Sequence, residues 1–343
     1  MEKAQTNKNK QTGRKTQLGD IADALGISKA TVSRAISGKG RVSAETRQKV
    51  SACIKELNYR PNMIAKSLSE NKTYNIGIVI PMDNMESEAP FFQTCLMEIT
   101  RRCAMRNYDT LAIGTDRNDY SQLRRVVRNG KADGIIITRP LADGIMEKFL
   151  TEENIPYVVI GRSEEKNAYT VDSDHRRGCC ELTSYLLMNN PPESIALFIG
   201  SMEQTVNRSR YDGFCDAFAA SEIQPQRDMI FKGAETPIQI KNIVSELISK
   251  TPRCVICGDD MLCVKLLSEL SQEGKSIPDD MRVASFYDSI YLDSYSPPIT
   301  SLRFSAGEIG AEAATVLLDI LSGISAEKNT SLGFEMLVRS STL

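Results

Sequence analysis

The pattern of hydrophobic and polar positions changes near residue 72. From residue 18 to residue 68 apolar side chains recur at helical spacing, whereas from residue 75 onward short β-branched runs alternate with stretches long enough for a helix. The apolar runs at 76–80, 111–113, 134–137, 157–160, 195–199, 254–257 and 283–286 predict strands, and the predicted helices between them include 94–106, 176–188, 210–220, 238–249 and 261–272. Strands alternating with helices predict parallel sheets covered on both faces, and this many strands fit two α/β halves better than one sheet.

Residues 18–37 predict two short helices joined by a tight turn. A first helix over residues 18–25 is followed by Gly26, at a corner where a turn can need a positive φ. Ser28 is a natural N-cap for a second helix, because its hydroxyl can accept a hydrogen bond from a free backbone N–H. Ala22, Gly26 and Val32 have the spacing of a helix-turn-helix.

Two further helices are predicted before residue 72. A third helix begins near Ser43, which is its expected N-cap, and ends before Pro61. Pro61 suits the start of a fourth, short helix, which is marginal in isolation and forms only against a partner. Leu68, at its end, suits a wedge in the DNA minor groove, and a flexible linker is the alternative for the free protein.

The charge of the chain divides at the same place. The 343 residues carry a net charge of −2, but residues 1–72 hold 15 basic and 6 acidic side chains, or +9, which leaves −11 for the rest. A basic head on an acidic body indicates a nucleic-acid-binding head. A disordered basic tail accounts for residues 1–15 only, and a three-helix bundle without a DNA partner does not account for the charge.

Composition excludes several other classes of protein. A single histidine disfavours a multi-histidine metal or catalytic site, and the chain has no G-x-G-x-x-G, P-loop or G-x-S-x-G motif, so we expect neither an enzyme nor a cofactor. The nine cysteines lie mostly in apolar runs. Cys254 and Cys257 lie three apart on a predicted strand and therefore face opposite sides, so we expect buried, inert thiols there and at Cys179-Cys180 rather than a metal site. With no membrane-length apolar run or signal sequence, we expect a cytoplasmic protein.

Four segments of the chain resemble one family closely. Ile21-Ala-Asp-Ala-Leu-Gly-Ile-Ser-Lys-Ala-Thr-Val-Ser-Arg, Val42-Ser-Ala-Glu-Thr-Arg, Leu57-Asn-Tyr-Arg-Pro-Asn and Asn75-Ile-Gly-Ile-Val-Ile-Pro are similar to the LacI/GalR family of bacterial transcription regulators. The resemblance runs from about residue 16 to residue 341. It implies a homodimer, with a tetramer not excluded, that reads a pseudo-palindromic operator in double-stranded DNA.

The resemblance also implies a domain plan. We expect a basic tail at 1–15, a small all-α helix-turn-helix domain at 16–61, a hinge helix and linker at 62–72, and an effector-binding α/β body at 73–343. The body is expected to hold two doubly wound parallel-sheet subdomains of the periplasmic-binding-protein type. The N-subdomain spans about 73–173 and 303–332, and the C-subdomain about 174–302 and 333–343, with crossings near Asp174, Leu302 and Gly333.

Residue by residue, the resemblance places DNA contacts on the helical head. Lys29, Ala30 and Arg34 are expected in the major groove, where short and basic side chains can reach base edges. The full expected set is Leu18, Ser28, Lys29, Ala30, Thr31, Ser33, Arg34, Ser37, Tyr59, Asn62 and Leu68.

The expected effector site lies in the cleft between the two subdomains. Its candidate residues follow predicted strands, where open α/β sheets bind ligands, and are Phe91, Phe92, Asp174, Arg210, Asp259, Tyr287 and Asp288. One phenylalanine is expected to face a sugar ring or a base, and Arg210 matches the arginine that grips ligand hydroxyls or carboxylates. His175 is expected to be solvated or hydrogen-bonding rather than catalytic.

Two of these positions depart from the family pattern. Asp259 replaces a common asparagine, which removes a donor and adds charge. Tyr287 stands where a ligand-binding aspartate is usual, so that either the tyrosine meets a ring or Asp288 turns into the cleft instead. The departure at Tyr287 weakens the case for a simple hexose as the ligand, because sugar hydroxyls often need that carboxylate.

The sequence therefore predicts a ligand-responsive regulator, most often a repressor in this family, controlled by a sugar or sugar derivative. The alternative is a corepressor-dependent regulator that responds to a purine or to a phosphorylated carrier protein.

Overall fold

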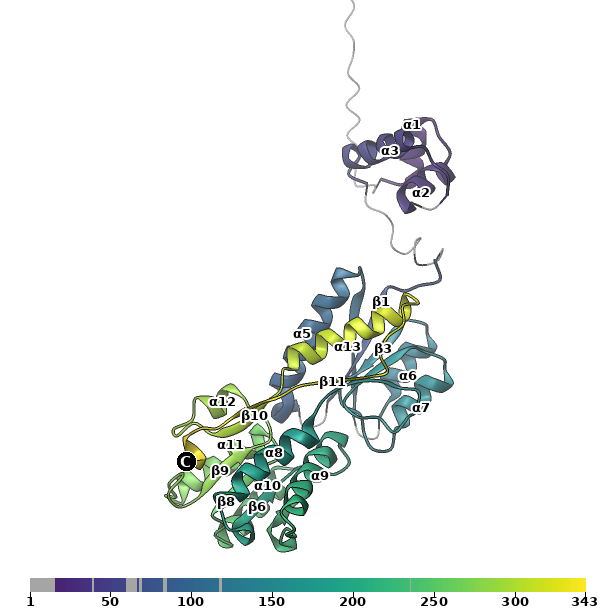
Figure 1. Ribbon diagram of the computed structural model, residues 1–343. Coiled ribbons are helices and arrows are strands. Elements are labelled where there is room, and N and C mark those ends of the chain that lie inside the picture. Colours follow the sequence, from purple (N-terminus) through teal and green to yellow (C-terminus); the bar gives the residue numbers. More distant parts are fainter. Residues whose placement is uncertain are drawn as a thin grey trace, which may run out of the picture. The chain divides into compact units, whose positions relative to one another are not determined.

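The computed structural model describes residues 16–38, 40–59, 67, 70–82, 85–116, 119–234 and 236–343 (Figure 1). The chain divides into two compact units, Met1–Lys72 and Thr73–Leu343. The expected tail at 1–15 and most of the expected hinge helix at 62–72 lie outside the described residues.

The first unit contains three helices, α1 (Leu18–Leu25), α2 (Lys29–Ser37) and α3 (Ala44–Glu56). The predicted caps are confirmed: the hydroxyl oxygens of Ser28 and Ser43 each accept a hydrogen bond at 3.1 Å, from the backbone N–H groups of Thr31 and Thr46. Gly26 ends α1 with a φ of 64°, as the predicted turn requires. The three helices enclose a small core of buried side chains: Ile21, Ala22, Val32, Val50, Cys53 and Tyr59.

The N-subdomain of the second unit is built on a parallel sheet. Its strand order is β11-β5-β4-β3-β1-β2, with β1 at Asn75–Pro81, β2 at Asp109–Thr115, β3 at Gly134–Ile137, β4 at Tyr157–Ile160, β5 at Tyr169–Ser173 and β11 at Asn329–Leu332. Helices α5 (Met85–Met105) and α13 (Ala306–Leu321) lie side by side on one face, and α6 (Ser121–Arg128) and α7 (Ile145–Glu152) cover the other (Figure 1).

The C-subdomain has a second sheet, in the order β12-β10-β9-β8-β6-β7. These strands are β6 (Ile195–Phe198), β7 (Ile230–Phe231), β8 (Cys254–Cys257), β9 (Arg282–Ser285), β10 (Thr300–Arg303) and β12 (Glu335–Leu337), and only β12 runs antiparallel to its neighbour. Short 3-10 turns lie at Pro192–Ser194, Arg227–Met229 and Ser340–Thr342.

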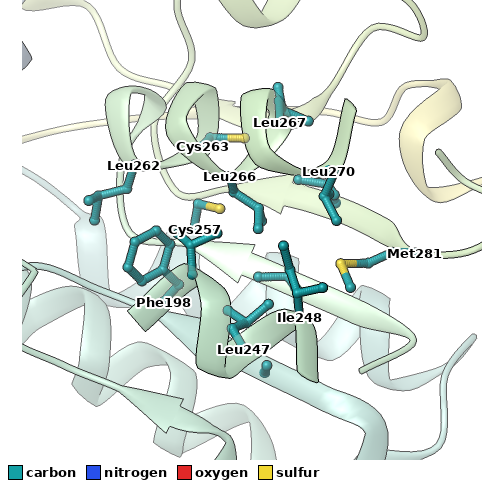
Figure 2. Packing of buried hydrophobic residues seen from close by; sticks show 14 of the residues in the cluster. Phe198, Leu247, Ile248, Cys257, Leu262, Cys263, Leu266, Leu267, Leu270 and Met281 are labelled. Atoms are coloured by element: carbon teal, nitrogen blue, oxygen red, sulfur yellow. The ribbon is translucent and has the colours of Figure 1, made fainter. Parts of the chain in front are cut away.

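Helices cover both faces of this second sheet as well. Helices α8 (His175–Leu187) and α9 (Thr205–Ala220) pack on one face, and α10 (Pro237–Ser249) and α11 (Asp260–Gln272) pack on the other, followed by the short α12 (Ile290–Asp293). Figure 2 shows the core under α11, where Leu262, Leu266 and Leu270 lie above the sheet near Phe198 and Met281.

The chain passes between the subdomains after β5, after β10 and after β11. The second crossing was expected near Leu302 and lies one residue beyond it. Leu302 and Arg303 still belong to the second sheet, where they pair with Met336 and Glu335 of β12. The crossing therefore follows Arg303, because the antiparallel pairing with β12 extends β10.

Both thiols of the Cys254–Cys257 strand are buried, and they face opposite sides as predicted. Cys254 packs in the cluster beneath α8 and α9, whereas Cys257 packs beneath α10 and α11 (Figure 2). Burial raises the pKa of Cys254 to about 12 and that of Cys257 well above its ordinary value. The expectation of a buried thiol is wrong for Cys180, which is partly exposed. In the part of the chain that the structure describes, no group of His, Cys, Asp and Glu is arranged to hold a metal ion, and no helix is long and apolar enough to cross a membrane.

Candidate DNA-binding and effector sites

Helix α2 presents a polar and basic surface. Val32 is fully buried in the helical core, while Ser28, Lys29, Ala30, Ser33 and Arg34 are exposed and Thr31 is partly exposed. The exposed residues lie at the N-terminus and on the outward face of one helix. A helix with this arrangement can enter a major groove with its first residues toward the base edges.

Other expected DNA contacts do not share this surface. The side chain of Tyr59 is 8% exposed and belongs to the helical core, which leaves little of its surface for the expected contact with DNA. The backbone explains its position, since the N–H of Tyr59 bonds the carbonyl of Ile54 and turns the ring inward after α3. Leu18 is partly buried against the same core. Asn62, Leu68 and the side chain of Ser37 lie outside the described residues.

A cavity of about 110 Å³ lies between the two subdomains. The N-subdomain contributes α5, the segments after β3 and β4, and the end of β5, and the C-subdomain contributes α9, the start of α11 and the segment after β9. These are carboxyl ends of parallel strands and the helices that follow them, where open α/β sheets bind ligands. Of the expected effector residues, Phe91, Phe92, Arg210, Asp259 and Tyr287 line this cavity.

Aromatic rings form one wall of the cavity. The ring of Phe91 meets that of Tyr287 edge-on, with centroids 6.2 Å apart, and Tyr287 lies nearly parallel to Phe304 at 6.3 Å. Phe91 and Phe92 are also in edge contact, at 5.3 Å. The wall joins residues from both subdomains, so its geometry depends on how the two halves close.

Arg210 is the buried cation of the cavity. It lies on α9, is 7% exposed, and its Nε has no hydrogen-bond partner in the described part of the chain. Its guanidinium carbon lies 5.8 Å from the centre of the Tyr287 ring. A buried charge without a close partner is costly, and a ligand that supplies an acceptor offsets that cost.

Three carboxyl groups line the same cavity. Burial raises the pKa of Asp172 and of Asp260 to about 6, although Arg210 lowers both. Burial also raises the pKa of Asp259, whose Oδ1 caps α11 by accepting the N–H of Leu262 at 2.8 Å. Asp172 and Asp260 were not among the expected site residues.

His175 also lines the cavity, and the expectation of a solvated side chain is wrong. The residue is 8% exposed, and its ring centroid lies 4.2 Å from that of Phe304. Burial lowers the pKa of His175 well below its ordinary value, and the nearby Arg210 lowers it further, so the ring is neutral. Its Nδ1 has no hydrogen-bond partner in the described structure, and its Nε2 lies 3.9 Å from Oδ1 of Asp172.

Two expected effector residues lie away from the cavity. Asp174 caps α8, where its Oδ1 accepts the N–H of Arg177 at 3.2 Å, so its carboxylate serves the helix instead of the cleft. Asp288 does not turn into the cleft either. Its Oδ1 accepts hydrogen bonds from Ser301 at 2.7 Å and from Arg339 at 2.8 Å, and its Oδ2 pairs with Arg303 at 3.0 Å.

The residues that the sequence reasoning missed had only weak signals. Asp172 alternates with the apolar Val171 in a short, polar strand that the hydrophobic pattern does not reveal. Asp260 directly follows the predicted Asp259, and Phe304 follows the last strand of the second sheet. Position after a strand was a usable signal for Asp260 and Phe304, but it does not say which neighbour faces the cavity.

Comparison with known proteins finds relatives of both the helical head and the α/β body. Residues 17–62 match the model for bacterial regulatory proteins of the lacI family, and residues 188–342 match a periplasmic binding protein-like domain. The HTH-type transcriptional repressor PurR of Actinobacillus pleuropneumoniae serotype 3 is 27% identical over 312 residues, which cover 88% of this chain and 90% of that protein. PurR of Haemophilus influenzae is 26% identical over 94% of this chain and 98% of that protein.

Solved structures share the fold over nearly the whole chain. A complex of the transcriptional regulator CelR with cellobiose has a TM-score of 0.71 at 25% identity and covers 95% of this chain and 100% of its own. A lac repressor dimer bound to operator and the anti-inducer ONPF has a TM-score of 0.80 at 22% identity, over 96% and 100% of the two chains. The helical head, the two-sheet body and these similarities together indicate a ligand-responsive, DNA-binding transcription regulator whose residues 17–62 match the lacI family of bacterial regulatory proteins.

Proposed function

We propose that the protein is a repressor that binds a pseudo-palindromic operator as a homodimer and is controlled by a sugar or sugar derivative in the cavity between its subdomains. The observation that carries the proposal is Arg210, a buried cation in that cavity whose Nε has no partner in the described structure. Such a group is stable in a folded protein mainly when a ligand completes its hydrogen bonds.

The surface of α2 supports the DNA-binding part of the proposal. Lys29 and Arg34 are exposed beside the small side chains of Ala30 and Ser33, which allow close approach to base edges. The positive charge of residues 1–72 favours contact with phosphates. The other exposed positions on α2 then set the register on DNA.

An apolar groove between α11 and α12 supports the dimer. Val264 and Leu267 line it, and Ile290 and Tyr291 beside them are 74% and 54% exposed. Large apolar side chains gathered at one surface mark interaction sites. A second copy of the chain, placed with the same face toward the first, would cover the groove on both subunits.

The cavity lining supports a ring with several polar groups. Carboxylates accept hydrogen bonds from hydroxyls, Arg210 donates to ring or hydroxyl oxygens, and Phe91 and Tyr287 can pack on the apolar face of a sugar. The CelR structure was solved with cellobiose, a sugar. The similarity thus agrees with the chemistry of the lining.

A corepressor-dependent regulator that binds a purine is the second candidate. Its supporting observation is the aromatic wall, since Phe91, Tyr287 and Phe304 offer flat surfaces to a base. The similarity to repressors named PurR agrees with the repressor part of this candidate. The two candidates predict opposite effects of the ligand on operator affinity, because a corepressor raises that affinity and an inducer lowers it.

The test measures operator affinity by fluorescence anisotropy with and without sugars, sugar derivatives and purines. Ligands are first chosen by thermal shift, because a ligand that binds the folded state raises the melting temperature. We expect one ligand class to change the operator Kd at least tenfold. If no cavity ligand changes operator affinity, the proposal is wrong.

The matching variant is Arg210→Gln, which we expect to bind operator normally but lose the response to ligand by tenfold or more. Arg176→Gln is the control, because Arg176 lies on the neighbouring α8 and forms an exposed ion pair with Asp216. Melting temperatures without ligand show whether each variant folds. An unchanged ligand response in a folded Arg210→Gln protein contradicts the assignment.

A further inference from the structure

The cavity has an excess of acidic groups. Among the described residues, the groups that can carry charge in its lining are three carboxyl groups, Asp172, Asp259 and Asp260, and two guanidinium groups, Arg139 and Arg210, beside a neutral histidine and the phenol of Tyr287. The carboxylate of Asp259 caps α11. The carboxyl groups of Asp172 and Asp260 cap no helix and line the cavity. A bound molecule therefore meets more negative than positive charge.

The opposite charges of the cavity do not neutralise one another directly. Among the described residues, no ion pair within 4.0 Å joins Arg210 to any of the three carboxyl groups, although its charge acts on all three. Arg210 is more than nine-tenths buried with Nε unpartnered. The cavity thus keeps one hydrogen-bond donor, Arg210, apart from two acceptors, the carboxyl groups of Asp172 and Asp260. A ligand that contacts both must carry an acceptor for the arginine and a donor for the carboxyl groups.

We propose, building on the function proposed above, that the effector is a ring compound that carries a protonated amine, such as an amino sugar. The amine lies against the carboxylates of Asp172 and Asp260, and a ring or hydroxyl oxygen accepts from Nε of Arg210. A neutral sugar of the same size satisfies the arginine but leaves the excess negative charge in place.

The proposal predicts that the affinity for the amine depends on pH. Burial raises the pKa of Asp172 and Asp260 to about 6, and a bound cation favours their charged forms. The charged and titratable groups that face the carboxyl group of Asp172 are Arg162, Arg210, Asp174 and His175. Those that face the carboxyl group of Asp260 are Asp259, Arg210 and Tyr287. Amine binding should therefore weaken as the pH falls from 7 to 5, because protons then compete with the amine.

The experiment compares matched ligands on the full-length protein by thermal shift and calorimetry at pH 7.5. The sets are glucosamine, glucose, N-acetylglucosamine and glucuronate, with the corresponding compounds of the galactose and mannose series. We expect at least one free amine to bind tenfold or more tightly than its neutral and acidic partners. That ratio corresponds to about 1.4 kcal/mol.

Two variants locate the amine. Asp172→Asn and Asp260→Asn keep the shape of each side chain and remove a charge that burial disfavours, so both should fold. We expect each to reduce the preference for the amine over the neutral sugar at least fivefold. Asp174→Asn is the control, because Asp174 lies two residues from Asp172 but caps α8 outside the cavity lining.

The outcomes separate this proposal from the proposed function. A neutral or acidic sugar that binds most tightly and changes operator affinity overturns the amine and leaves the repressor intact. Absence of binding by every amine also overturns it. An amine that binds in the cavity without changing operator affinity supports the ligand class but contradicts the repressor mechanism.

Discussion

Arg339 holds the loop that carries Tyr287, and its removal gives a measurable loss of stability. Its guanidinium donates hydrogen bonds to Asp288 at 2.8 Å, to Asp293 at 2.8 Å and to the carbonyl of Ile299 at 2.7 Å. The side chains of Arg339 and Asp288 are 12% and 5% exposed. The substitution Arg339→Met leaves a shorter, unbranched apolar side chain and removes every one of these donors.

The size of the loss follows from what remains around Asp288. Breaking a buried ion pair costs about 3–5 kcal/mol, because it leaves a buried charge without its partner. Arg303 and Ser301 still contact Asp288 in the variant, but Arg303 is half exposed, so the lower end, about 3 kcal/mol, is expected. For a body of this size the melting temperature should fall by roughly 6–12 °C.

The assay is thermal and urea unfolding of both proteins between pH 3 and pH 8. Burial acts to raise the pKa of Asp288, but its bonds to Arg339, Ser301 and Arg303 together lower it below the ordinary value. The pair therefore stabilises the fold above the pKa of an unfolded aspartate, about 3.9, and loses this effect as the pH falls through the lower, folded pKa. The difference between the proteins should be full at pH 7 and should shrink below about pH 4.

The control is Arg177→Met, which removes an exposed ion pair with Glu181 and should cost less than about 1 kcal/mol. A loss below about 1 kcal/mol for Arg339→Met at pH 7, or a difference that stays constant down to pH 3, would refute the reasoning.

Three other predictions concern separate parts of the molecule. Arg34→Ala should weaken operator binding, and the loss of a phosphate contact should lower the slope of log K against log salt by about 1. A salt titration followed by anisotropy measures both, and an unchanged operator affinity contradicts the prediction. Gly310→Ala should destabilise the body by about 2 kcal/mol or more, because a Cβ there would lie 2.6 Å from the carbonyl oxygen of Cys95 on α5; urea unfolding measures it, and a neutral effect contradicts the close packing of α5 on α13. Cys254 and Cys257 should resist a thiol reagent at pH 8 in the folded protein and react after unfolding, since burial raises the pKa of both; fast labelling of either in the native state would show that the strand opens.

Much of the fold was predictable because local chemistry decides it. Ser28 and Ser43 cap helices through their own hydroxyls, and Gly26 adopts the positive φ that the turn after α1 requires. The run Cys254–Cys257 is apolar enough to form an interior strand of a sheet that is buried on both faces. The interior strands β5 and β10 and the edge strands β7, β11 and β12 escaped prediction, because their pairing comes from neighbours rather than from their own apolar pattern.

The sequence by itself determined the helices of the basic head, the apolar central strands and the strand ends where a ligand cavity forms, because periodicity, capping and charge are local properties of the chain. Only the tertiary structure decided which carboxylate at each strand end faces the cavity. Asp172 and Asp260 line it, whereas Asp174 turns back to cap α8 and Asp288 is held by Arg303 and Arg339. Those two arginines lie 15 and 51 residues away along the chain, and partners at such separations meet only when the second sheet and the last crossing segment have assembled.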